Sequence, residues 1–456
     1  MSFIADFHIH SHFSLATSKE LTPPFLDLWA RIKGIGVIGT GDATHPGWLN
    51  ELKQCLIPGN NGLLTLKKDQ SISPSDFGFN ISGEVPQFIL TAEISNIYKR
   101  NSKVRKVHNL LLIPGFEEAE KLQQQLTIHR FNITSDGRPI IGLDSRDLLD
   151  MLLNISENIM LIPAHIWTPW FSVLGDKSGF DRISDCYGDL TNKIYAVEMG
   201  LSSDPPMNWL ISQLDRFTLL SNSDAHSPEK LGRNANIFQC DPTYEFIIAA
   251  LKGNGKFGGT ISFFPQEGKY HYDGHRKCSI CWNPLETLRH KGICPVCETR
   301  VTIGVMSRVA QLADRNDFFA RPNRSPAYSL IPLKELLAEI LDKGETTKPV
   351  IKKYQQLINQ AGTEFNLLLH MSHEQIAGLC DPIITEAIMR MRNRNVIISE
   401  GYDGEYGKIK VFEKGTGAHP VAFSDLQKER PAQRPLISFD IKEYRKLKQE
   451  IPAEDI

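Results

Sequence analysis

The sequence predicts a protein of the α/β class whose first half is built on a parallel sheet or barrel. From residue 3 onward, short runs of β-branched and aromatic residues alternate with helical patterns. Such alternation is typical of parallel strands that are joined by helices. At 456 residues the chain is also too long for one ordinary core, so we expect two or three domains.

The individual elements of this first half follow from local patterns. The strand-like runs are short and apolar, and the stretches between most of them repeat apolar residues at helical spacing. Residues 58–86 interrupt the rhythm with Gly, Pro, Ser and Asn, which predicts a surface insertion. The predicted strands cover residues 3–9, 37–40, 88–94, 107–113, 159–163, 194–197 and 217–220, and the predicted helices cover 24–33, 46–54, 117–126 and 145–153.

The composition is that of an ordinary globular protein, with 41% hydrophobic and 23% charged residues. No apolar run is long enough to span a membrane, and the first residues lack the basic flank and cleavage site of a signal peptide. We therefore expect a cytoplasmic protein with no membrane contact. The net charge of −2 gives no overall reason to bind nucleic acid, so such binding would require local basic patches.

Two residues beyond the strand at 217–220 suggest a metal site. Asp224 and His226 are two positions apart, so in an extended chain their side chains point the same way. The carboxyl ends of strands are where α/β barrels build active sites, and a carboxylate with an imidazole binds divalent metals. Taken alone, such a pair is more often part of a turn.

The other predicted strands carry the same signal. Each single residue has an ordinary alternative, a satisfied buried histidine or a helix cap, and this alternative is favoured for His108 or Glu198 alone. The whole series favours a shared metal cluster, because chance would rarely place a ligand type in or after nearly every strand. The series comprises His8, His10, Asp42, Glu93, His108, His165, Glu198, Asp224 and His226.

Five of these segments resemble, in order, the motifs of the PHP (polymerase and histidinol phosphatase) superfamily. The resemblance implies a distorted (β/α)7 barrel over residues 1–262 that holds two or three metal ions and hydrolyses phosphoesters. One departure is Ala43, where many members have histidine, so a third metal would depend on His12 or His45. The matching segments are Phe7-His8-Ile9-His10, Ala92-Glu93, Val107-His108, Pro163-Ala164-His165 and Ser223-Asp224-Ala225-His226.

The resemblance also implies roles for these residues. Asp224, Asp42 and His226 would be the catalytic residues. The mixture of imidazoles and carboxylates suits Zn²⁺ or Mn²⁺ better than Mg²⁺ alone. Two such ions about 3.5–4 Å apart can bind the attacking and the leaving oxygen of a displacement. His8, His10, Glu93 and Asp224 would hold one ion; Glu93, His108 and His165 would hold a second; and Asp42, His226 and His12 would border a third.

Two loops near these residues are candidates for contact with DNA. Trp167, Trp170 and Phe171 follow His165 and could stack on a base, or equally pack on the barrel rim. Ser202 and Ser203 follow the strand at 194–197, in a polar loop that suits either a phosphate or a simple turn.

Residues 263–325 are predicted to form a zinc ribbon. Cys278, Cys281, Cys294 and Cys297 form two Cys-x-x-Cys pairs, which predict one structural Zn²⁺ with a closed coordination sphere. Between residues 276 and 324, nine Lys and Arg face four Asp and Glu. This local excess suits a polyanionic substrate, with solvated surface charge as the alternative. Arg276, Lys277 and Arg308 are the basic candidates for DNA contact.

The remainder is predicted as a mainly helical domain, residues 326–412, and a polar, mobile tail, residues 413–456. Helical periodicity covers residues 333–342, 351–358 and 382–391. In the tail, Gln433, Leu436 and Phe439 have the spacing of a sliding-clamp-binding peptide, although Asp440 replaces its second aromatic residue.

The combination of motifs over residues 1–412 resembles endonuclease Q. Membership would imply a DNA repair endonuclease that cuts 5′ of deaminated bases (hypoxanthine, uracil, xanthine) and of abasic sites. A phosphatase acting on a small phosphomonoester is the alternative, but it would not need the basic ribbon. A non-enzymatic DNA-binding protein with a decayed barrel is disfavoured by the complete ligand series. The motifs are Gly-Thr-Gly-Asp (39–42), His-x-Trp-Thr-Pro-Trp-Phe (165–171), Gly-Leu-Ser-Ser-Asp-Pro (200–205), Thr-Ile-Gly-Val-Met (302–306) and Gly-Tyr-Asp-Gly-Glu-Tyr-Gly (401–407).

Overall fold

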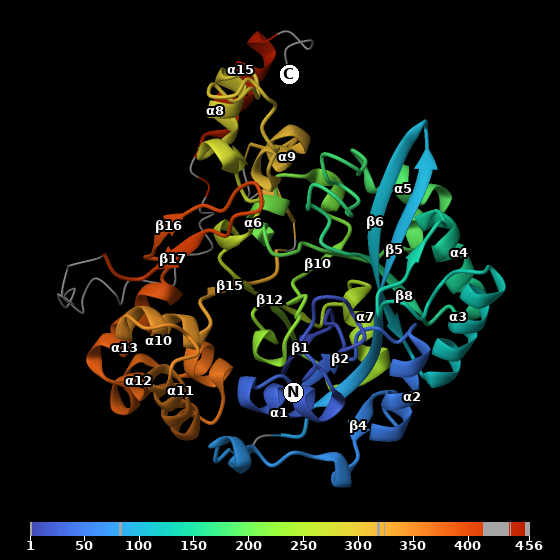
Figure 1. Cartoon of the computed structure of the whole chain (residues 1–456), viewed down its shortest axis with the longest axis vertical. Helices are drawn as coiled ribbons and strands as arrows, with labels where there is room; N and C mark the ends of the chain where they lie inside the picture. The colour runs from blue at the N-terminus through green and yellow to red at the C-terminus, as the bar shows by residue number, and fades with distance from the viewer. Residues whose placement is uncertain are drawn as a thin grey trace.

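The computed structural model has a sheet of parallel and antiparallel strands at its centre with helices around it, which confirms the predicted α/β class (Figure 1). It describes residues 2–81, 84–316, 320–322, 324–413, 437 and 439–451. The sheet runs in the order β15-β12-β11-β1-β2-β5-β4-β3, and β6, β7 and β8 extend it from β5. Its strands are β1 (Phe3–Asp6), β2 (Val37–Gly39), β3 (Leu56–Pro58), β4 (Leu64–Leu66), β5 (Gln87–Arg100), β6 (Lys103–Ile113), β7 (Ile140–Ile141), β8 (Met160–Pro163), β11 (Ala235–Phe238), β12 (Phe257–Phe263) and β15 (Ala327–Leu330).

Strand direction follows the predicted parallel pattern in part. β1, β2 and the start of β5 are parallel, and β9 (Ala196–Glu198) and β10 (Thr218–Leu220) form a separate parallel pair. β6 departs from the pattern because it runs antiparallel to β5 along its whole length. The link between them is Asn101-Ser102, whose φ angles of 54° and 61° suit a two-residue hairpin turn.

Side chains from many strands meet in one buried apolar cluster. β1, β2, β5, β6, β8, β9 and β10 all contribute to it, and α7 (Tyr244–Leu251) closes one end. Because side chains alternate along a strand, the opposite faces pack in a larger cluster against the outer helices. A shared interior is what the predicted barrel requires, but closure into seven strands stays a prediction. The outer helices are α1 (Pro23–Lys33), α2 (Pro46–Cys55), α3 (Phe116–Ile128), α4 (Ser145–Ile155), α5 (Ile183–Tyr187) and α6 (Pro205–Asn208).

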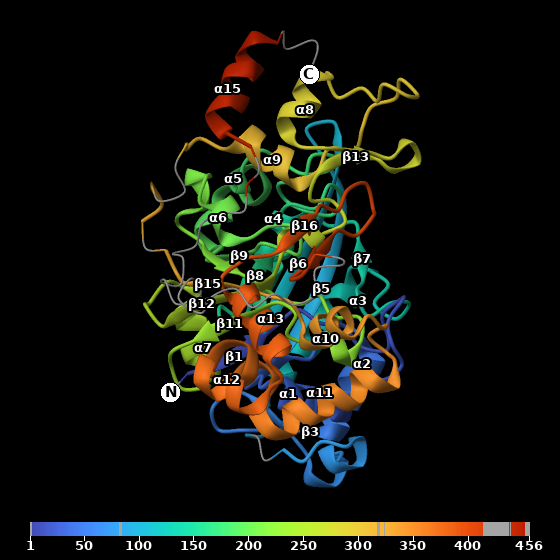
Figure 2. The same ribbon diagram turned by 90° about the vertical axis from the view of Figure 1, so that its left-hand side faces the viewer.

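The second half of the chain packs against this core. β15 lies in the predicted helical domain, yet it pairs in parallel with β12 of the central sheet. The helices that follow gather beside the sheet (Figure 2) and are tied to α1 by Lys33, whose Nζ lies 2.6 Å from Glu364 Oε2. The elements are β13 (Asp273–His275), β14 (Ile280–Trp282), α8 (Pro284–Arg289), α9 (Val305–Leu312), α10 (Leu333–Leu341), α11 (Lys348–Ala361), α12 (His373–Leu379), α13 (Pro382–Arg392), β16 (Ile397–Ser399) and β17 (Lys408–Lys410).

The last part of the predicted tail forms a helix, whereas the mobility of the tail stays a prediction. Helix α15 (Ile441–Glu450) docks on α8, where Tyr444 packs with Leu285 and Leu288. The amphipathic spacing of Ile441 and Tyr444 explains this contact, and it was overlooked among the surrounding charges. Of the predicted clamp-binding peptide, residues 433–436 lie outside the described residues, and the Phe439 ring packs 6.1 Å from that of Tyr444. Among the described helices, none combines the length and apolar character needed to cross a membrane.

Candidate active site

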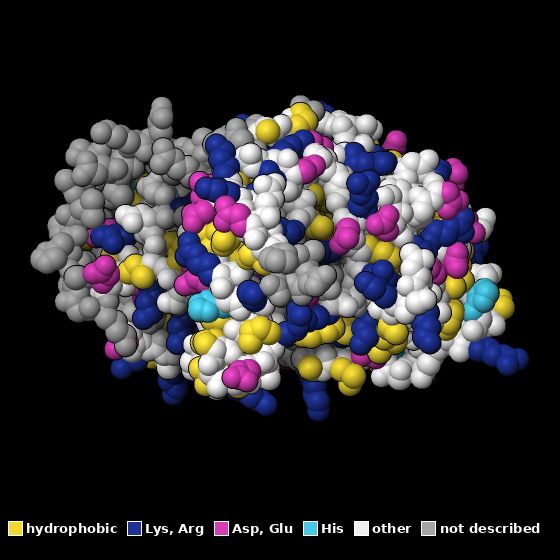
Figure 3. Space-filling view, turned by 90° about the horizontal axis from the view of Figure 1, so that it is seen from above, with side chains coloured by type: hydrophobic (Ala, Val, Ile, Leu, Met, Phe, Trp, Pro, Cys, Tyr) yellow, Lys and Arg dark blue, Asp and Glu magenta, His cyan; other side chains and the backbone are white. Residues whose placement is uncertain are grey.

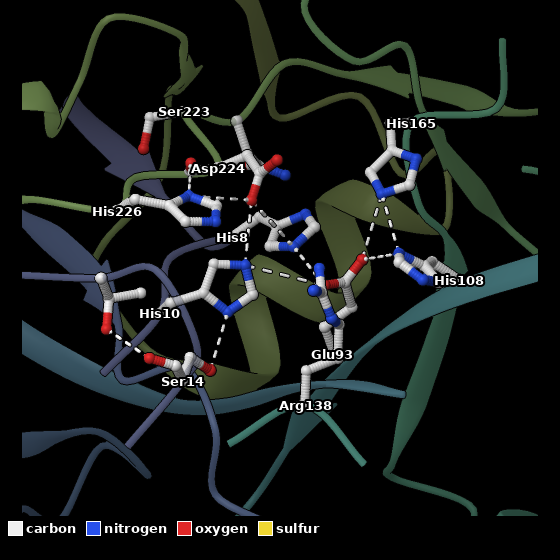
Figure 4. Close-up of polar contacts among 12 residues, drawn as sticks. His8, His10, Ser14, Glu93, His108, Arg138, His165, Ser223, Asp224 and His226 are labelled. Atoms are coloured by element: carbon white, nitrogen blue, oxygen red, sulfur yellow. Dashed lines mark hydrogen bonds and ion pairs between the residues drawn. The ribbon is translucent and has the colours of Figure 1, made fainter. Parts of the chain in front are cut away.

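The metal-capable side chains predicted from the sequence converge on Glu93, which lies in β5 and is 1% exposed (Figure 4). Its Oε1 lies 2.6 Å from His108 Nδ1 and 3.1 Å from His165 Nε2. Its Oε2 faces the other side, 3.5 Å from His8 Nε2 and 3.6 Å from His10 Nε2. Each oxygen of the carboxylate therefore serves a different pair of imidazoles.

These contacts form three groups of residues that share members. Within each group, the ligand atoms all lie within 4.8 Å of one another. Glu93 belongs to two of them, as expected for a carboxylate that bridges two ions. His10 also belongs to two, and its Nε2 lies 2.9 Å from Asp224 Oδ1. The groups are His8, His10 and Glu93; Glu93, His108 and His165; and His10, Asp224 and His226.

His8 shows most directly that the site suits a cation. Its Nδ1 lies 3.0 and 2.9 Å from the two oxygens of Glu198, and a carboxylate only accepts hydrogen bonds, so Nδ1 carries the proton. Nε2 then offers a lone pair whenever it carries no proton of its own, and it is buried without a hydrogen-bond partner. Such an orphaned nitrogen, held by a carboxylate on the other side of the ring, is the usual arrangement of a metal-bound histidine.

Asp42 was predicted as a catalytic residue and metal ligand, but its carboxylate is taken up by protein groups. Oδ1 lies 3.3 Å from His10 Nδ1, and Oδ2 accepts hydrogen bonds from the Ser11 backbone N–H, the Ser11 hydroxyl and the Ser14 hydroxyl. Asp42 thus orients the His10 ring and is absent from the three groups of ligand atoms. His12 also lies apart, because its Nε2 pairs with Glu51 at 2.8 Å.

Three residues at or beside the cluster have a strained backbone. Asp42, His165 and Asp224 have φ angles of 48°, 27° and 49°, which side chains rarely adopt. Each strained residue follows a strand, where the left-handed conformation turns its side chain toward the cluster. Such strain persists only where the surrounding structure holds it, and it is typical of functional sites.

The electrostatics of the cluster are those of a site built for positive charge. Burial opposes a charged His10, but hydrogen bonds to Asp224 and Asp42 raise its pKa to about 10. Burial likewise opposes a charged Glu93, yet the neighbouring imidazoles of His108 and His8 hold its pKa well below the usual range. Burial lowers the pKa of His108 to about 4, so this ring is neutral at pH 7 and offers a lone pair.

A second group of ligand atoms lies in the predicted ribbon, and it differs from the predicted set. It comprises His275, Cys278, Cys294 and Cys297, without Cys281. Ile280 and Trp282, the neighbours of Cys281 in β14, pack beside Cys294 in a small core. Because side chains alternate along a strand, Cys281 points to the other face, where it packs on the main core. The donors still fit a structural Zn²⁺, with one imidazole in place of a thiolate.

Comparison with known structures identifies the family. The chain matches the lesion-specific endonuclease PfuEndoQ from Pyrococcus furiosus with a TM-score of 0.80 and 32% identity, over 93% of this chain and 99% of that one. The chain belongs to the endonuclease Q family. A second match, with a TM-score of 0.77 and 33% identity, covers 91% of this chain and 97% of an endonuclease Q bound to a 27-mer duplex with an abasic lesion at the active site.

Sequence comparisons extend this result to other relatives. The chain is 34% identical over 252 residues to the uncharacterized protein MJ0043 of Methanocaldococcus jannaschii. That match covers 53% of this chain but only 31% of the relative. Residues 332–395 match the family model described as the MJ0043 C-terminal domain. Membership in the endonuclease Q family confirms the prediction that the chain is an enzyme of the endonuclease class.

Three of the aromatic and polar candidates for DNA contact are buried in this member of the endonuclease Q family. Trp167 is 1% exposed, and its Nε1 donates a hydrogen bond to Asn208, so it cannot stack on a base. Ser202 and Ser203 are also buried, and the Ser203 hydroxyl donates to the Met199 carbonyl. The sequence could not show which side of these loops faces the core.

Trp170 and Phe171, the other two aromatic candidates, are less buried than Trp167. Trp170 is 40% exposed and meets Tyr270 edge to face, with ring centroids 6.0 Å apart. Phe171 is half-buried; its ring lies 4.8 Å from that of His108 and carries Lys106 Nζ 5.1 Å from its centroid. Phe171 therefore borders the cluster at His108, whereas Trp170 lies against Tyr270 of the predicted ribbon segment.

The three basic candidates for DNA contact differ in whether protein groups already engage them. Arg308 is held by the carbonyls of Leu174 and Phe180 and by Asp181, so it ties the ribbon to the barrel. Arg276 and Lys277 are exposed. Seen from above, lysine and arginine side chains are spread over the surface among acidic and apolar ones (Figure 3).

The structure adds site residues that sequence patterns did not reveal. Arg138 Nη1 lies 3.2 Å from Glu93 Oε2, and the side chain is 30% exposed. Arg138 lies in a loop between predicted elements, so nothing in its spacing marked it. Glu198 was seen as a possible ligand, but its oxygens accept hydrogen bonds from the His165 backbone N–H and from Asn222 as well as from His8.

Proposed function

We propose that the chain is a metal-dependent DNA endonuclease that cuts the strand 5′ of deaminated bases (hypoxanthine, uracil, xanthine) and of abasic sites. The observation that carries this proposal is Glu93, whose two oxygens face separate pairs of imidazoles in a chain of the endonuclease Q family. A bridged pair of cations is the arrangement that hydrolyses phosphodiesters in many nucleases. The relative that was solved with an abasic duplex at its active site supports DNA as the partner.

The proposed cation sites follow from the three groups of ligand atoms. His8, His10, Glu93 and Asp224 would hold one ion, and Glu93, His108 and His165 a second; His226 would complete a third together with His10 and Asp224. The donor set suits Zn²⁺ or Mn²⁺. Bound cations would lower the pKa of a water molecule toward 7 and neutralise charge on the cleaved phosphate.

The protein's own groups would then orient the reaction. Glu198 fixes the His8 ring so that Nε2 faces Glu93, and Asp42 does the same for His10 through Nδ1. Arg138 uses one guanidinium nitrogen on Glu93 and is partly exposed, so we assign its other donors to the phosphate that is cleaved. The half-exposed ring of Trp170 would support the displaced base or its neighbour.

A duplex with one labelled strand and a single hypoxanthine, uracil or abasic site tests the proposal. We expect a single nick 5′ of the lesion in the presence of Mn²⁺, Zn²⁺ or Mg²⁺, and no nick in the undamaged duplex. Asp224→Asn should reduce nicking by more than about a hundredfold, because it removes a charged ligand. Asp342→Asn is the matched control, since Asp342 has a φ of 48° at the end of α10, far from the cluster in sequence and outside its groups.

Two results would refute the proposal. One is equal nicking by wild type and Asp224→Asn, which would point to a contaminating nuclease. The other is hydrolysis of a chromogenic phosphomonoester at a rate far above that on any lesion duplex, which would favour a small-molecule phosphatase.

A further inference from the structure

A cavity lies at the opposite end of β10 from the metal cluster. Asp224 and His226 follow the last residue of this strand, whereas the cavity is lined by Phe217 and Thr218 at its start. Its volume is about 520 Å³, within the range of small-molecule sites. Thr260 of β12, Trp209 and three arginines, Arg216, Arg321 and Arg324, also line it.

Arg321 is the most unusual residue of this cavity. It is 8% exposed, its Nη2 donates to the Phe217 carbonyl at 2.9 Å, and its Nη1 is buried without a hydrogen-bond partner. Burial lowers its pKa to about 10, so it remains charged at neutral pH. A buried charge with an unsatisfied donor costs several kcal/mol unless an anion or acceptor meets it.

The nearest acid does not meet this requirement. Asp215 also lines the cavity, but both of its oxygens are engaged by Arg315, with Nη1 2.7 Å from Oδ1 and Nη2 on Oδ2. This bidentate pair already neutralises the carboxylate. Within the described part of the chain, Arg321 has no carboxylate of its own, so its positive charge is directed into the cavity.

A second buried donor lines the same cavity. The Thr260 hydroxyl is buried and has no hydrogen-bond partner, although a hydroxyl in this environment is normally satisfied. Arg216 is exposed beside the cavity, and the Arg324 guanidinium lies 5.5 Å from the Trp209 ring centroid. Two unsatisfied donors and two further guanidinium groups thus surround a space with no unneutralised acid among its described lining residues.

We propose that this cavity binds a small phosphorylated ligand of nucleotide size, with its phosphate on Arg321 and Thr260. The planar guanidinium offers paired donors that match a phosphate, and a hydroxyl adds a third. Because β10 separates the cavity from the metal cluster, this site is distinct from the proposed site of DNA cleavage. The inference does not depend on the nuclease reaction.

Calorimetric titration of the full-length protein with inorganic phosphate and with dAMP tests the proposal. Phosphate could also bind at the metal cluster, so the same titrations are made with Glu93→Gln, which disrupts that cluster alone. We expect saturable binding that Glu93→Gln retains and that Arg321→Gln and Thr260→Val weaken by about ten- to a hundredfold, the effect of one charge-assisted hydrogen bond. Arg182→Gln, an exposed arginine at the start of α5, is the control and should bind as wild type does.

The outcomes separate cleanly. Loss of binding in Arg321→Gln with a wild-type melting temperature supports the site, and so does protection of wild type, but not Thr260→Val, from heat by dAMP. Equal affinity in wild type and Arg321→Gln overturns it, as does loss of binding in Glu93→Gln alone. If neither phosphate nor dAMP binds while undamaged duplex DNA does, the small-ligand assignment is wrong and the DNA backbone is the source of the phosphate.

Discussion

Replacing Glu198 with glutamine tests how the cluster holds its cations. Of the residues in the three ligand groups, Glu198 is hydrogen-bonded to His8 and to the backbone N–H of His165. The substitution keeps the size of the side chain but removes its charge, and one amide end becomes a donor that cannot accept from His8 Nδ1. The His8 ring would then face one neutral acceptor oxygen in place of a charged carboxylate, so the hydrogen bond that directs its lone pair at Nε2 toward Glu93 would be weaker.

The size of the effect follows from the charge that this hydrogen bond loses. A hydrogen bond to a charged group contributes about 1.5–3 kcal/mol, and about 1.4 kcal/mol corresponds to a tenfold change in an equilibrium constant. We therefore expect the metal affinity to fall by about ten- to a hundredfold, as seen for other groups that support a metal-bound histidine. Nicking should recover at high metal concentration, because the ligands themselves remain.

The assay is nicking of a lesion duplex as a function of Mn²⁺ concentration, together with direct titration of the metal-free protein. Glu364→Gln is the control, because Glu364 is equally buried and paired with Lys33 but lies in the helical part of the chain. It should lower the melting temperature without changing the metal dependence. If Glu198→Gln shifts the metal midpoint by less than twofold, or if Glu364→Gln shifts it as far, the orienting role assigned to Glu198 is wrong.

Three further experiments test separate parts of the structure. Arg138→Gln should lower kcat by about ten- to a hundredfold with the metal midpoint little changed, and Arg138→Lys should restore part of the rate if the charge acts on phosphate. His275→Ala should release zinc from the purified protein, measured by a chromogenic chelator, whereas Cys281→Ser should retain it. Burial and the neighbouring Glu335 raise the pKa of Glu267 to about 8, well above an unfolded glutamate, so its contribution to folding is complete in acid and is lost as the pH rises through about 8. In the wild type, the free energy of unfolding measured by urea denaturation should therefore fall between about pH 5 and pH 8, and Glu267→Gln should reduce this fall by on the order of a few kcal/mol. The same pH dependence in wild type and Glu267→Gln would contradict this assignment.

The positions of the metal-capable residues could be predicted because the strands that carry them are visible in the sequence. A strand end fixes where a side chain begins, so His8, Glu93, His165 and Asp224 were expected to meet, and the structure brings them together. The direction in which a side chain points from a strand end could not be predicted in the same way. Asp42 is near the cluster, yet the two serines that engage its carboxylate come from another segment, and no local pattern announces that contact.

The remaining differences arise from tertiary contacts that override local patterns. Cys281 has the spacing of a ligand, but its place in β14 turns it away from the other thiols. Trp167 has the composition of a stacking residue, but Asn208 holds it in the core. The β5–β6 hairpin was missed because Asn-Ser is a weaker turn signal than Asn-Gly, although both residues adopt the left-handed conformation.

The balance of charge around Glu93 explains why these residues need one another. Four carboxylates lie close together in the cluster, those of Asp42, Glu93, Glu198 and Asp224. The Arg138 guanidinium pairs with one of them, Glu93. Without cations, protons on His8 and His10 must supply the missing positive charge, which is why burial fails to keep the pKa of either ring low. His8 Nε2 and His10 Nε2 would hold a bound cation in place of those protons, and the cation would supply the positive charge. Glu198 and Asp42, the carboxylates behind the rings, would keep their pairing with Nδ1 and so hold both imidazoles in place.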